Sequence, residues 1–555
     1  MSSPTATKVT RLVSAVVLVA AAAGLVIIVL PNDARPGRAR ARQTATPPYV
    51  VAPRTVSKQA ARPLPVRFLA ADGVESTTIR RENARPGTTD WLIPAGVSTS
   101  AIAGFADHVD AAPGDVVHLF VSARSARFSV EAFRMGFYGG AGARLVWRSA
   151  EVLSRRQPAC RTSLATHMVS CANWSPSLTV SLTSQFVPGD YLLKLVSATG
   201  QGYVPLTVWD PTSDAAYVIK NDVYTWQAWN LYGGYDFYAG LGSCPPDVYP
   251  TCNRARVVSF DRPYAYGDGA GDFLGNEYPL VRLAEQQGLD VTYVTDLTIE
   301  QRPGLLLTHR ALLSLGHDEC WSLHERLALV SAENHGVNVA FFGASPILRH
   351  VRLEPSPLGT GRQEVDYRDS SADPLDHHGD PREVTGNTWG SPPASWPANH
   401  FVGAVYAGFL EPAAPPGAFV VAQGNAWIFH GTGLRTGSVL PGVLRSDFDQ
   451  FDVNDHPLSE EVLGHSPISL VHAQSLVGHS RGGVYSDMTY YTDGHSGAGV
   501  FDSGTNNWIP ALQCADCPAS DIRIITTNLL WLFGQGPSAQ LQPSHPNWQQ
   551  VYGAR

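Results

Sequence analysis

A short polar turn contains the residues best suited to chemistry. The apolar run Ala311–Leu315 predicts a buried strand, and His317, Asp318 and Glu319 follow it closely. In an open α/β sheet the ligand crevice lies outside the carboxyl ends of the strands, which is where these side chains would lie. His317 is a candidate general base or metal ligand, and Glu319 is a candidate general acid, base or metal ligand. The alternative is a hydrogen-bonded turn that only caps the following helix.

Cys320 ends this turn and is the one cysteine without a close neighbour in the sequence. A thiol beside a helix N-terminus and a histidine has a lowered pKa, as a nucleophile requires. Cys320 is therefore a candidate catalytic residue together with His317 and Glu319. The alternative is that Cys320 is a small buried hydrophobic residue that only fills the core.

An aromatic segment, Asn221–Tyr238, follows the first strand of the same predicted sheet. Its rings could stack on a sugar or another flat ligand, and its amides could form hydrogen bonds to that ligand. The candidate substrate-binding residues are Tyr224, Trp226, Gln227, Trp229 and Asn230. Equally, these aromatic side chains could simply pack the interface between two domains.

Two further segments carry weaker signals. Four aspartates crowd Arg445–Pro457, which suits a hard cation such as calcium, but the spacing and terminal glutamate of an EF-hand are missing. A solvated acidic loop is the favoured interpretation there. The turn in Phe501–Trp508 could bind an anion at a helix start. The sequence contains no GxSxG, HExxH or P-loop motif.

The elements that must position these residues fall into two domains. Residues 65–210 contain short β-branched and aromatic runs separated by Gly, Pro and Asp, which predicts a β-sandwich. Residues 211–540 alternate apolar strands with amphipathic helices, which predicts an open α/β sheet. The stretch 350–480 is irregular and leans towards β-structure. Residues 541–555 are expected to form a tail. The β-sandwich and the α/β domain together give a multidomain α+β fold class.

The N-terminal segment has a different composition. Leu12–Leu30 is uncharged and, as a helix, would reach roughly 28 Å, close to the ~30 Å thickness of a bilayer core. Residues 1–30 are therefore expected to form a cytoplasmic stub and an uncleaved membrane anchor. Residues 31–64 are rich in Pro, Arg, Ala and Thr, and they are expected to form an extended tether.

The cysteine spacing bears on the side of the membrane. Six of the 7 cysteines form close pairs, and short spacings suit local disulfides in an oxidising compartment. The expected pairs are Cys160 with Cys171, Cys244 with Cys252, and Cys514 with Cys517. The arginines after the apolar run favour the opposite orientation, but long domains cross the membrane largely regardless of flanking charge. We therefore expect a single-pass cell-membrane protein with its globular body outside the cytoplasm.

The charge distribution excludes one class of partner. The formal net charge is -8, and residues 1–65 carry many Lys and Arg residues against the single acid Asp33, so the globular body is more acidic than the whole chain. Nucleic-acid binding needs a basic surface to neutralise phosphates, and the body lacks one. The expected partners are the membrane, through the N-terminal helix, and a small amide or glycan ligand.

Several segments together resemble the N,N-dimethylformamidase large (beta) subunit family. They are FRMGFYGGAGARLVW (Phe133–Trp147), TWQAWNLYGG, VTYVTDL, GHDECW, NVAFFGAS and VFDSGTNNW. The resemblance covers residues 95 to 540 approximately. It implies a β-sandwich followed by a domain like the class I glutamine amidotransferase fold. It also implies hydrolysis of an amide C–N bond.

The resemblance further implies a mononuclear iron held by two tyrosines and a glutamate. In this chain the ligand set looks incomplete. Cys320 stands where a tyrosine ligand is expected, and Asn387 stands at the expected glutamate position. The other tyrosine ligand would be Tyr278 or Tyr293.

Two functions follow from the sequence. The first is a hydrolase of linear amide C–N bonds with an altered active site. The second is a non-catalytic surface module whose sandwich and aromatic segment bind a glycan or a protein partner.

Overall fold

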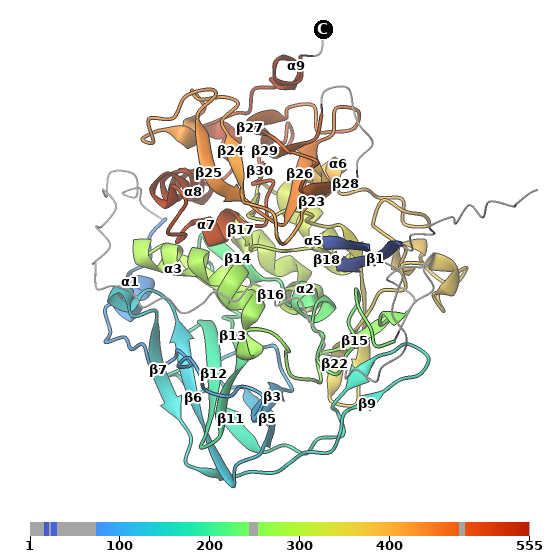
Figure 1. The fold of residues 1–555 in the computed structure, drawn as a ribbon. Coiled ribbons are helices and arrows are strands. Elements are labelled where there is room, and N and C mark those ends of the chain that lie inside the picture. The colour runs from blue at the N-terminus through green and yellow to red at the C-terminus, as the bar shows by residue number, and fades with distance from the viewer. Residues whose placement is uncertain (1–15, 22–23, 30–73, 243–252, 477–482, 554–555) are drawn as a thin grey trace, which may run out of the picture.

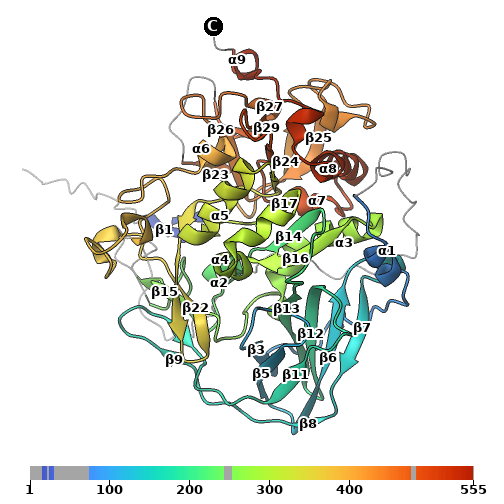
Figure 2. The same cartoon turned by 180° about the vertical axis from the view of Figure 1, so that it is seen from behind.

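The computed structural model describes residues 16–21, 24–29, 74–242, 253–476 and 483–553. Within these ranges the chain has a mixed α+β fold with several separate sheets, as predicted. In Figures 1 and 2 the strands of residues 102–208 lie at the lower end and the strands of residues 404–502 towards the upper end, with the strands of residues 217–221, 291–295 and 311–314 between them.

Two sheets in the N-terminal half share one apolar core. The smaller sheet has the order β11 (Leu178–Ser181), β5 (Val116–Ala123) and β3 (Ile102–Ala106). The larger sheet runs β4 (Asp110–Ala111), β13 (Gly200–Val208), β12 (Gly189–Ser197), β6 (Arg127–Met135) and β7 (Ala143–Arg148). Side chains from both sheets, such as Val117, Leu119 and Leu193, are fully buried between them. The two sheets pack as the β-branched, turn-punctuated sequence predicts.

The central sheet has seven strands. Its order is β16 (Val291–Thr295), β14 (Tyr217–Asn221), β17 (Ala311–Ser314), β19 (Asn338–Phe341), β30 (Gly499–Asp502), β29 (Tyr485–Thr492) and β27 (Glu461–Pro467). The first five strands are parallel to one another, β29 is antiparallel to β30, and β27 is antiparallel to β29. The parallel strands are wholly buried, which explains why they appear in the sequence as continuous apolar runs.

Helices cover both faces of this sheet. Ile219 and Leu313 share one core with α3 (Tyr278–Gln287) and α8 (Ala519–Gly534). Val218 and Leu312 share a second core with α4 (Asp296–Gln301) and α5 (Leu323–Asn334). Gly288 ends α3 in the left-handed region at φ 71, and the Ser322 hydroxyl caps α5 by accepting the Glu325 N–H. Successive strand residues therefore face opposite helical layers, as in an α/β fold.

Smaller sheets flank the central sheet, and most of their strands come from the segment between β19 and β29. They are β15 (Val257–Ser259) with β22 (Gly359–Val365) and β21 (Arg352–Ser356), β26 (Asp447–Phe451) with β23 (Ala404–Leu410) and β28 (Ala473–Ser475), β24 (Gly417–Val420) with β25 (Val439–Leu444), and β18 (Cys320–Trp321) with β20 (Arg349–His350). An isolated bridge from Phe448 to Thr505 attaches β26 beside the carboxyl end of β30. β26 therefore lies at the carboxyl edge of the central sheet, beside the polar turn that follows β17.

The predicted membrane helix is not supported. β1 (Val16–Ala21) and β2 (Gly24–Val29) pair as an antiparallel hairpin (Figure 1). Both strands are rich in valine and isoleucine, and such β-branched residues favour strands over helices. In the described ranges the structure has no helix with the length and apolar character needed to cross a bilayer. The tether predicted over residues 31–64 lies outside the described residues.

A buried ion pair joins the sandwich to the α/β layer. Arg134 of β6 contacts Glu285 of α3 through two hydrogen bonds of 2.6 and 2.9 Å, and both side chains are fully buried. The Tyr293 hydroxyl donates to the same carboxylate at 2.6 Å. Tyr278 donates to the carbonyls of Gly136 and Gly142 in the sandwich. These polar contacts fix the two layers against each other.

Candidate functional site

The polar turn after β17 lies at the carboxyl edge of the parallel strands, as predicted. Gly316 adopts φ 52, and a Cβ atom on Gly343 would lie 1.5 Å from the Gly316 carbonyl oxygen. The loops after β17 and β19 therefore approach each other too closely for any larger residue at Gly343. The hydroxyl of Ser314, the last residue of β17, donates to Asp318 at 2.5 Å and helps to fix the turn against the strand.

Glu319 is the most heavily hydrogen-bonded side chain of this turn. Its Oε2 accepts the Tyr238 hydroxyl at 2.5 Å and the Trp229 indole N–H at 3.3 Å, and its Oε1 accepts Arg349 Nε at 3.2 Å. Burial alone would raise the pKa of Glu319, but contact with His317 and the charge of Arg349 lower it to about 2. Glu319 is therefore a fixed carboxylate at neutral pH.

His317 lies between two carboxyl groups. Its Nε2 is 3.5 Å from Glu319 Oε2 and 3.6 Å from Asp447 Oδ2, and it makes no well-formed hydrogen bond with any described residue. Burial would lower the pKa of His317, but Glu319, Asp447 and Asp272 together raise it to about 9. The imidazole is therefore protonated at neutral pH, and its Nε2–H is available to a bound molecule.

Asp447 is the third titratable member of the site, and the sequence interpretation missed it. Asn506 Nδ2 donates to Asp447 at 3.2 Å, and the Tyr406 hydroxyl donates at 3.4 Å. Burial, reinforced by the charges of Glu319 and Asp449, raises the pKa of Asp447 to about 8 against the opposing charge of His317. A carboxyl group with this pKa can give or take a proton near neutral pH.

The favoured interpretation of Arg445–Pro457 as a solvated acidic loop is wrong for its first half. Asp447 and Asp449 belong to β26, whose residues are all buried. Asp449 accepts the Ser345 N–H at 2.9 Å through both oxygens. The sequence Asp-Phe-Asp-Gln-Phe from 447 to 451 alternates only as far as Asp449, so it gives a weak strand signal.

Arg349 connects the turn to a second loop. Besides Glu319, its guanidinium donates to the backbone and side-chain oxygens of Asn387 at 2.7 and 3.1 Å. Asn387, which the resemblance places at the family's glutamate position, thus lies beside the site and accepts hydrogen bonds from Arg349.

Of the aromatic segment, Trp229 joins the site. It stacks on Tyr238 with ring centroids 3.9 Å apart, and its ring lies 5.6 Å from that of His317. The remaining candidates lie within the interior. Tyr224 and Trp226 are buried, and Trp226 donates to Glu277.

Gln227 and Asn230 are also buried in packing. Gln227 accepts from Arg262, and Asn230 donates to Gln227 and to the Pro263 carbonyl. These positions match the packing alternative, and they offer no open platform for a sugar. Two small cavities beside Trp226, of about 20 and 10 Å³, lie towards the sandwich and hold little more than a water molecule each.

Cys320 lacks the properties of an activated nucleophile. Its side chain is fully buried, and burial together with the charges of Glu364 and Glu319 raises the pKa of the thiol. A nucleophilic cysteine needs a lowered pKa and access to substrate. Cys320 therefore matches the alternative of core packing, with its N–H donating to Thr225 Oγ1.

The other cysteines are placed as follows. Cys160 is bonded to Cys171, and Cys514 is bonded to Cys517, as predicted. The predicted pair of Cys244 and Cys252 lies outside the described residues.

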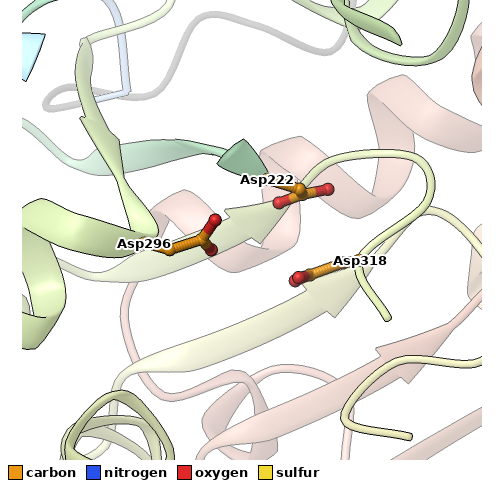
Figure 3. Close-up of side chains that lie close together, drawn as sticks. All are labelled: Asp222, Asp296 and Asp318. Atoms are coloured by element: carbon orange, nitrogen blue, oxygen red, sulfur yellow. The ribbon is translucent and has the colours of Figure 1, made fainter. Parts of the chain in front are cut away.

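The aspartates 222, 296 and 318 form a second candidate cation site below the turn. Figure 3 shows their carboxylates converging, with oxygen atoms within 4.8 Å of one another. However, Lys220 Nζ lies 2.5 Å from Asp296, 2.8 Å from Asp318 and 3.2 Å from Asp222. An ammonium group thus already supplies the positive charge, and the cluster is a buried ion-pair network that holds Asp318 in place.

Iron on two tyrosines and a glutamate, which the resemblance implies, does not fit the residues present. Tyr278 and Tyr293 are engaged at the sandwich interface. One phenol, that of Tyr238, donates to Glu319, while the phenol of Tyr406 donates to Asp447 and the indole of Trp229 contacts the same Glu319 oxygen as Tyr238. The carboxylate also lies beside the cations Arg349 and His317. The arrangement is suited to charge stabilisation and proton transfer.

Comparison with known proteins identifies the family. No curated protein matches the chain. A family model described as N,N-dimethylformamidase beta subunit-like, C-terminal, matches residues 129–520, which include β17, its polar turn, Arg349 and Asp447. The chain therefore belongs to the N,N-dimethylformamidase beta subunit-like family.

Proposed function

We propose that this chain hydrolyses the C–N bond of a small linear amide at the site formed by His317, Glu319 and Asp447. The observation that carries the proposal is the position of His317 Nε2, 3.5 and 3.6 Å from two carboxyl groups with opposite protonation behaviour. Family membership supports the choice of an amide as substrate.

Asp447 is the group best suited to move a proton. With a pKa of about 8 it can accept a proton from water as the water oxygen attacks the amide carbon. The same proton can then pass to the amine nitrogen as the C–N bond breaks, so that one carboxylic acid and one amine leave the site. Asn506 and Tyr406 hold Asp447 in position for both transfers.

His317 stabilises the negative charge that develops on the amide oxygen. Its pKa of about 9 keeps the imidazolium charged at neutral pH, and its Nε2–H has no strong competitor among the described residues. A positioned donor in a buried site stabilises an oxyanion far better than water does. Glu319, itself fixed by Tyr238 and Arg349, keeps His317 protonated.

The test is amine release from a panel of small formamides and acetamides. Asp447→Asn should lose at least about 100-fold in kcat/KM, because it removes the group that moves the proton. Asp455→Asn is the matched control, since Asp455 lies in the same segment but is half-exposed and pairs with His400. If purified protein releases no amine from any of these amides, or if Asp447→Asn behaves like Asp455→Asn, the proposal is wrong.

We also propose that the globular body works outside the cytoplasm. The two local disulfides, Cys160–Cys171 and Cys514–Cys517, support an oxidising compartment.

A further inference from the structure

We infer that Trp229 and Arg349 keep metal ions off Glu319, so that this member of the family works without the iron that its relatives imply. The inference concerns what occupies the space around one carboxylate. It rests on contacts and charges at the site, and it is independent of whether the substrate is an amide.

Trp229 fills the space beside Glu319 Oε2, with its indole nitrogen 3.3 Å from that oxygen. Its indole nitrogen is a donor only and has no lone pair to give to a metal. The N–H points at Glu319 Oε2, which also accepts the Tyr238 hydroxyl. Because Trp229 stacks on Tyr238 with an interplanar angle of 13°, the ring cannot turn aside without breaking that stack.

Arg349 covers the other carboxylate oxygen. Its Nε donates to Oε1 at 3.2 Å, and its side chain is 15% exposed, so its charge is poorly screened. A second guanidinium, Arg368, lies 4.2 Å from the centroid of the Tyr238 ring. A divalent or trivalent cation at Glu319 would be repelled by Arg349, whose guanidinium lies against the carboxylate, and less strongly by Arg368, which is itself paired with Asp366 at 3.0 Å.

These same cations replace what a metal would supply. A Lewis acid stabilises negative charge on a substrate oxygen, and a cluster of guanidinium and imidazolium groups can do so electrostatically. Buried Tyr238 then serves as a neutral hydrogen-bond donor to Glu319. This last role rests on the proposed function, whereas the exclusion of metal does not.

The experiment measures iron directly in the full-length protein. Wild-type protein and variants are incubated anaerobically with Fe(II), desalted, and analysed for metal content and for visible absorption after oxidation. We expect wild-type protein to retain no stoichiometric iron. Trp229→Tyr combined with Arg349→Ala should retain about one iron per chain and show a phenolate-to-iron charge-transfer band.

The matched control is Trp226→Tyr combined with Arg349→Ala. Trp226 lies on α2 (Val223–Ala228), which ends just before Trp229, and donates to Glu277, so this pair adds a phenol away from Glu319 and should retain less iron and show a weaker band than Trp229→Tyr/Arg349→Ala. One iron per chain in wild-type protein would overturn the inference. So would a folded Trp229→Tyr/Arg349→Ala variant, with a cooperative thermal transition, that takes up no iron. The single variant Arg349→Ala keeps the inference testable if the double variant does not fold. More iron in Arg349→Ala than in wild-type protein supports exclusion of metal by Arg349, and an equal iron content contradicts that exclusion. Amine release by iron-free wild-type protein is scored separately and tests only the proposed hydrolysis.

Discussion

Tyr238 donates a hydrogen bond of 2.5 Å to Glu319 across 81 residues of sequence, while Arg349 holds the opposite oxygen of the same carboxylate. The pair connects the aromatic segment after β14 to the polar turn after β17. Contact with His317, the charge of Arg349 and the hydrogen bond from Tyr238 keep Glu319 ionised, and the ionised Glu319 in turn keeps His317 protonated.

The first prediction concerns this hydrogen bond. Tyr238→Phe removes a charge-assisted bond to a buried carboxylate, which contributes about 1.5–3 kcal/mol. With one donor fewer, the Glu319 carboxylate becomes more basic and holds the proton on His317 more strongly, so the alkaline limb of the pH–rate profile should move to a pH above 9. Tyr235→Phe, in the same loop but with its ring tilted against that of His167, should leave that limb unchanged. An unshifted limb in Tyr238→Phe would show that the phenol does not act on the site.

The second prediction concerns pH and Asp447. A carboxyl whose folded-state pKa is raised from 3.8 to about 8 keeps its proton while the unfolded chain loses it. This stabilises the unfolded state increasingly as pH rises from about 4 to 8, by about 3–5 kcal/mol at the upper end. Asp447→Asn removes this effect. The variant should therefore melt above wild-type protein at pH 8 and gain much less at pH 5.

Thermal midpoints of the two proteins at several pH values check this prediction. A difference in midpoint that is equal at pH 5 and pH 8 would mean that Asp447 ionises normally in the fold. For activity, Asp447 must be ionised and His317 protonated, so kcat/KM should peak between about pH 8 and pH 9.

The third prediction concerns the ion pair between the sandwich and α3. Arg134→Met leaves Glu285 buried with only its neutral donors, and breaking a buried pair costs about 3–5 kcal/mol. Arg134→Met combined with Glu285→Met removes both charges and should recover a large part of that loss. Urea unfolding of both variants gives the comparison. A double variant no more stable than Arg134→Met would mean that Arg134 acts mainly through its bonds to the Pro188 carbonyl.

The sequence predicted the central sheet well and the site only in part, for physical reasons. Buried parallel strands such as Ala311–Ser314 are continuous apolar runs, and a turn at their carboxyl end is recognisable from position alone. Asp447 and Arg349 come from a stretch with many buried polar residues, where hydrophobic alternation is weak. Their contacts with His317 and Glu319 depend on tertiary packing that no local pattern encodes.

Cys320 and the apolar segment near the N-terminus show the limits of local composition, which leaves the role of Cys320 open and predicts a membrane helix that the structure does not support. Spacing does not distinguish a reactive thiol from a buried one, and Cys320 is fully buried. A valine-rich apolar run satisfies a hydropathy rule for helices, yet Val16–Ala21 and Gly24–Val29 pair as strands.

The fourth prediction concerns the cluster around Lys220. Because the ammonium group lies among Asp222, Asp296 and Asp318, Ca²⁺, Mg²⁺ and EDTA should all leave the thermal midpoint of wild-type protein unchanged. Lys220→Met strands buried carboxylates and should cost several kcal/mol, about 3–5 by analogy with other broken buried pairs. A calcium-dependent rise in the midpoint of wild-type protein would instead make the three aspartates a metal site.

The last prediction concerns the two disulfides, which differ in the length of chain that they close. The Cys160–Cys171 bond spans 11 residues and the Cys514–Cys517 bond spans 3. Since a longer closed loop restricts the unfolded chain more, the loop-entropy estimate is about 3 kcal/mol for the first and about 2 kcal/mol for the second. Cys160→Ser/Cys171→Ser should therefore lower the midpoint of urea unfolding more than Cys514→Ser/Cys517→Ser does. Mass spectrometry of unreduced peptides from protein isolated from its native cells should find both bonds formed. Free thiols at all four positions would place the globular body in a reducing compartment and overturn the proposed location, whatever the unfolding experiment shows.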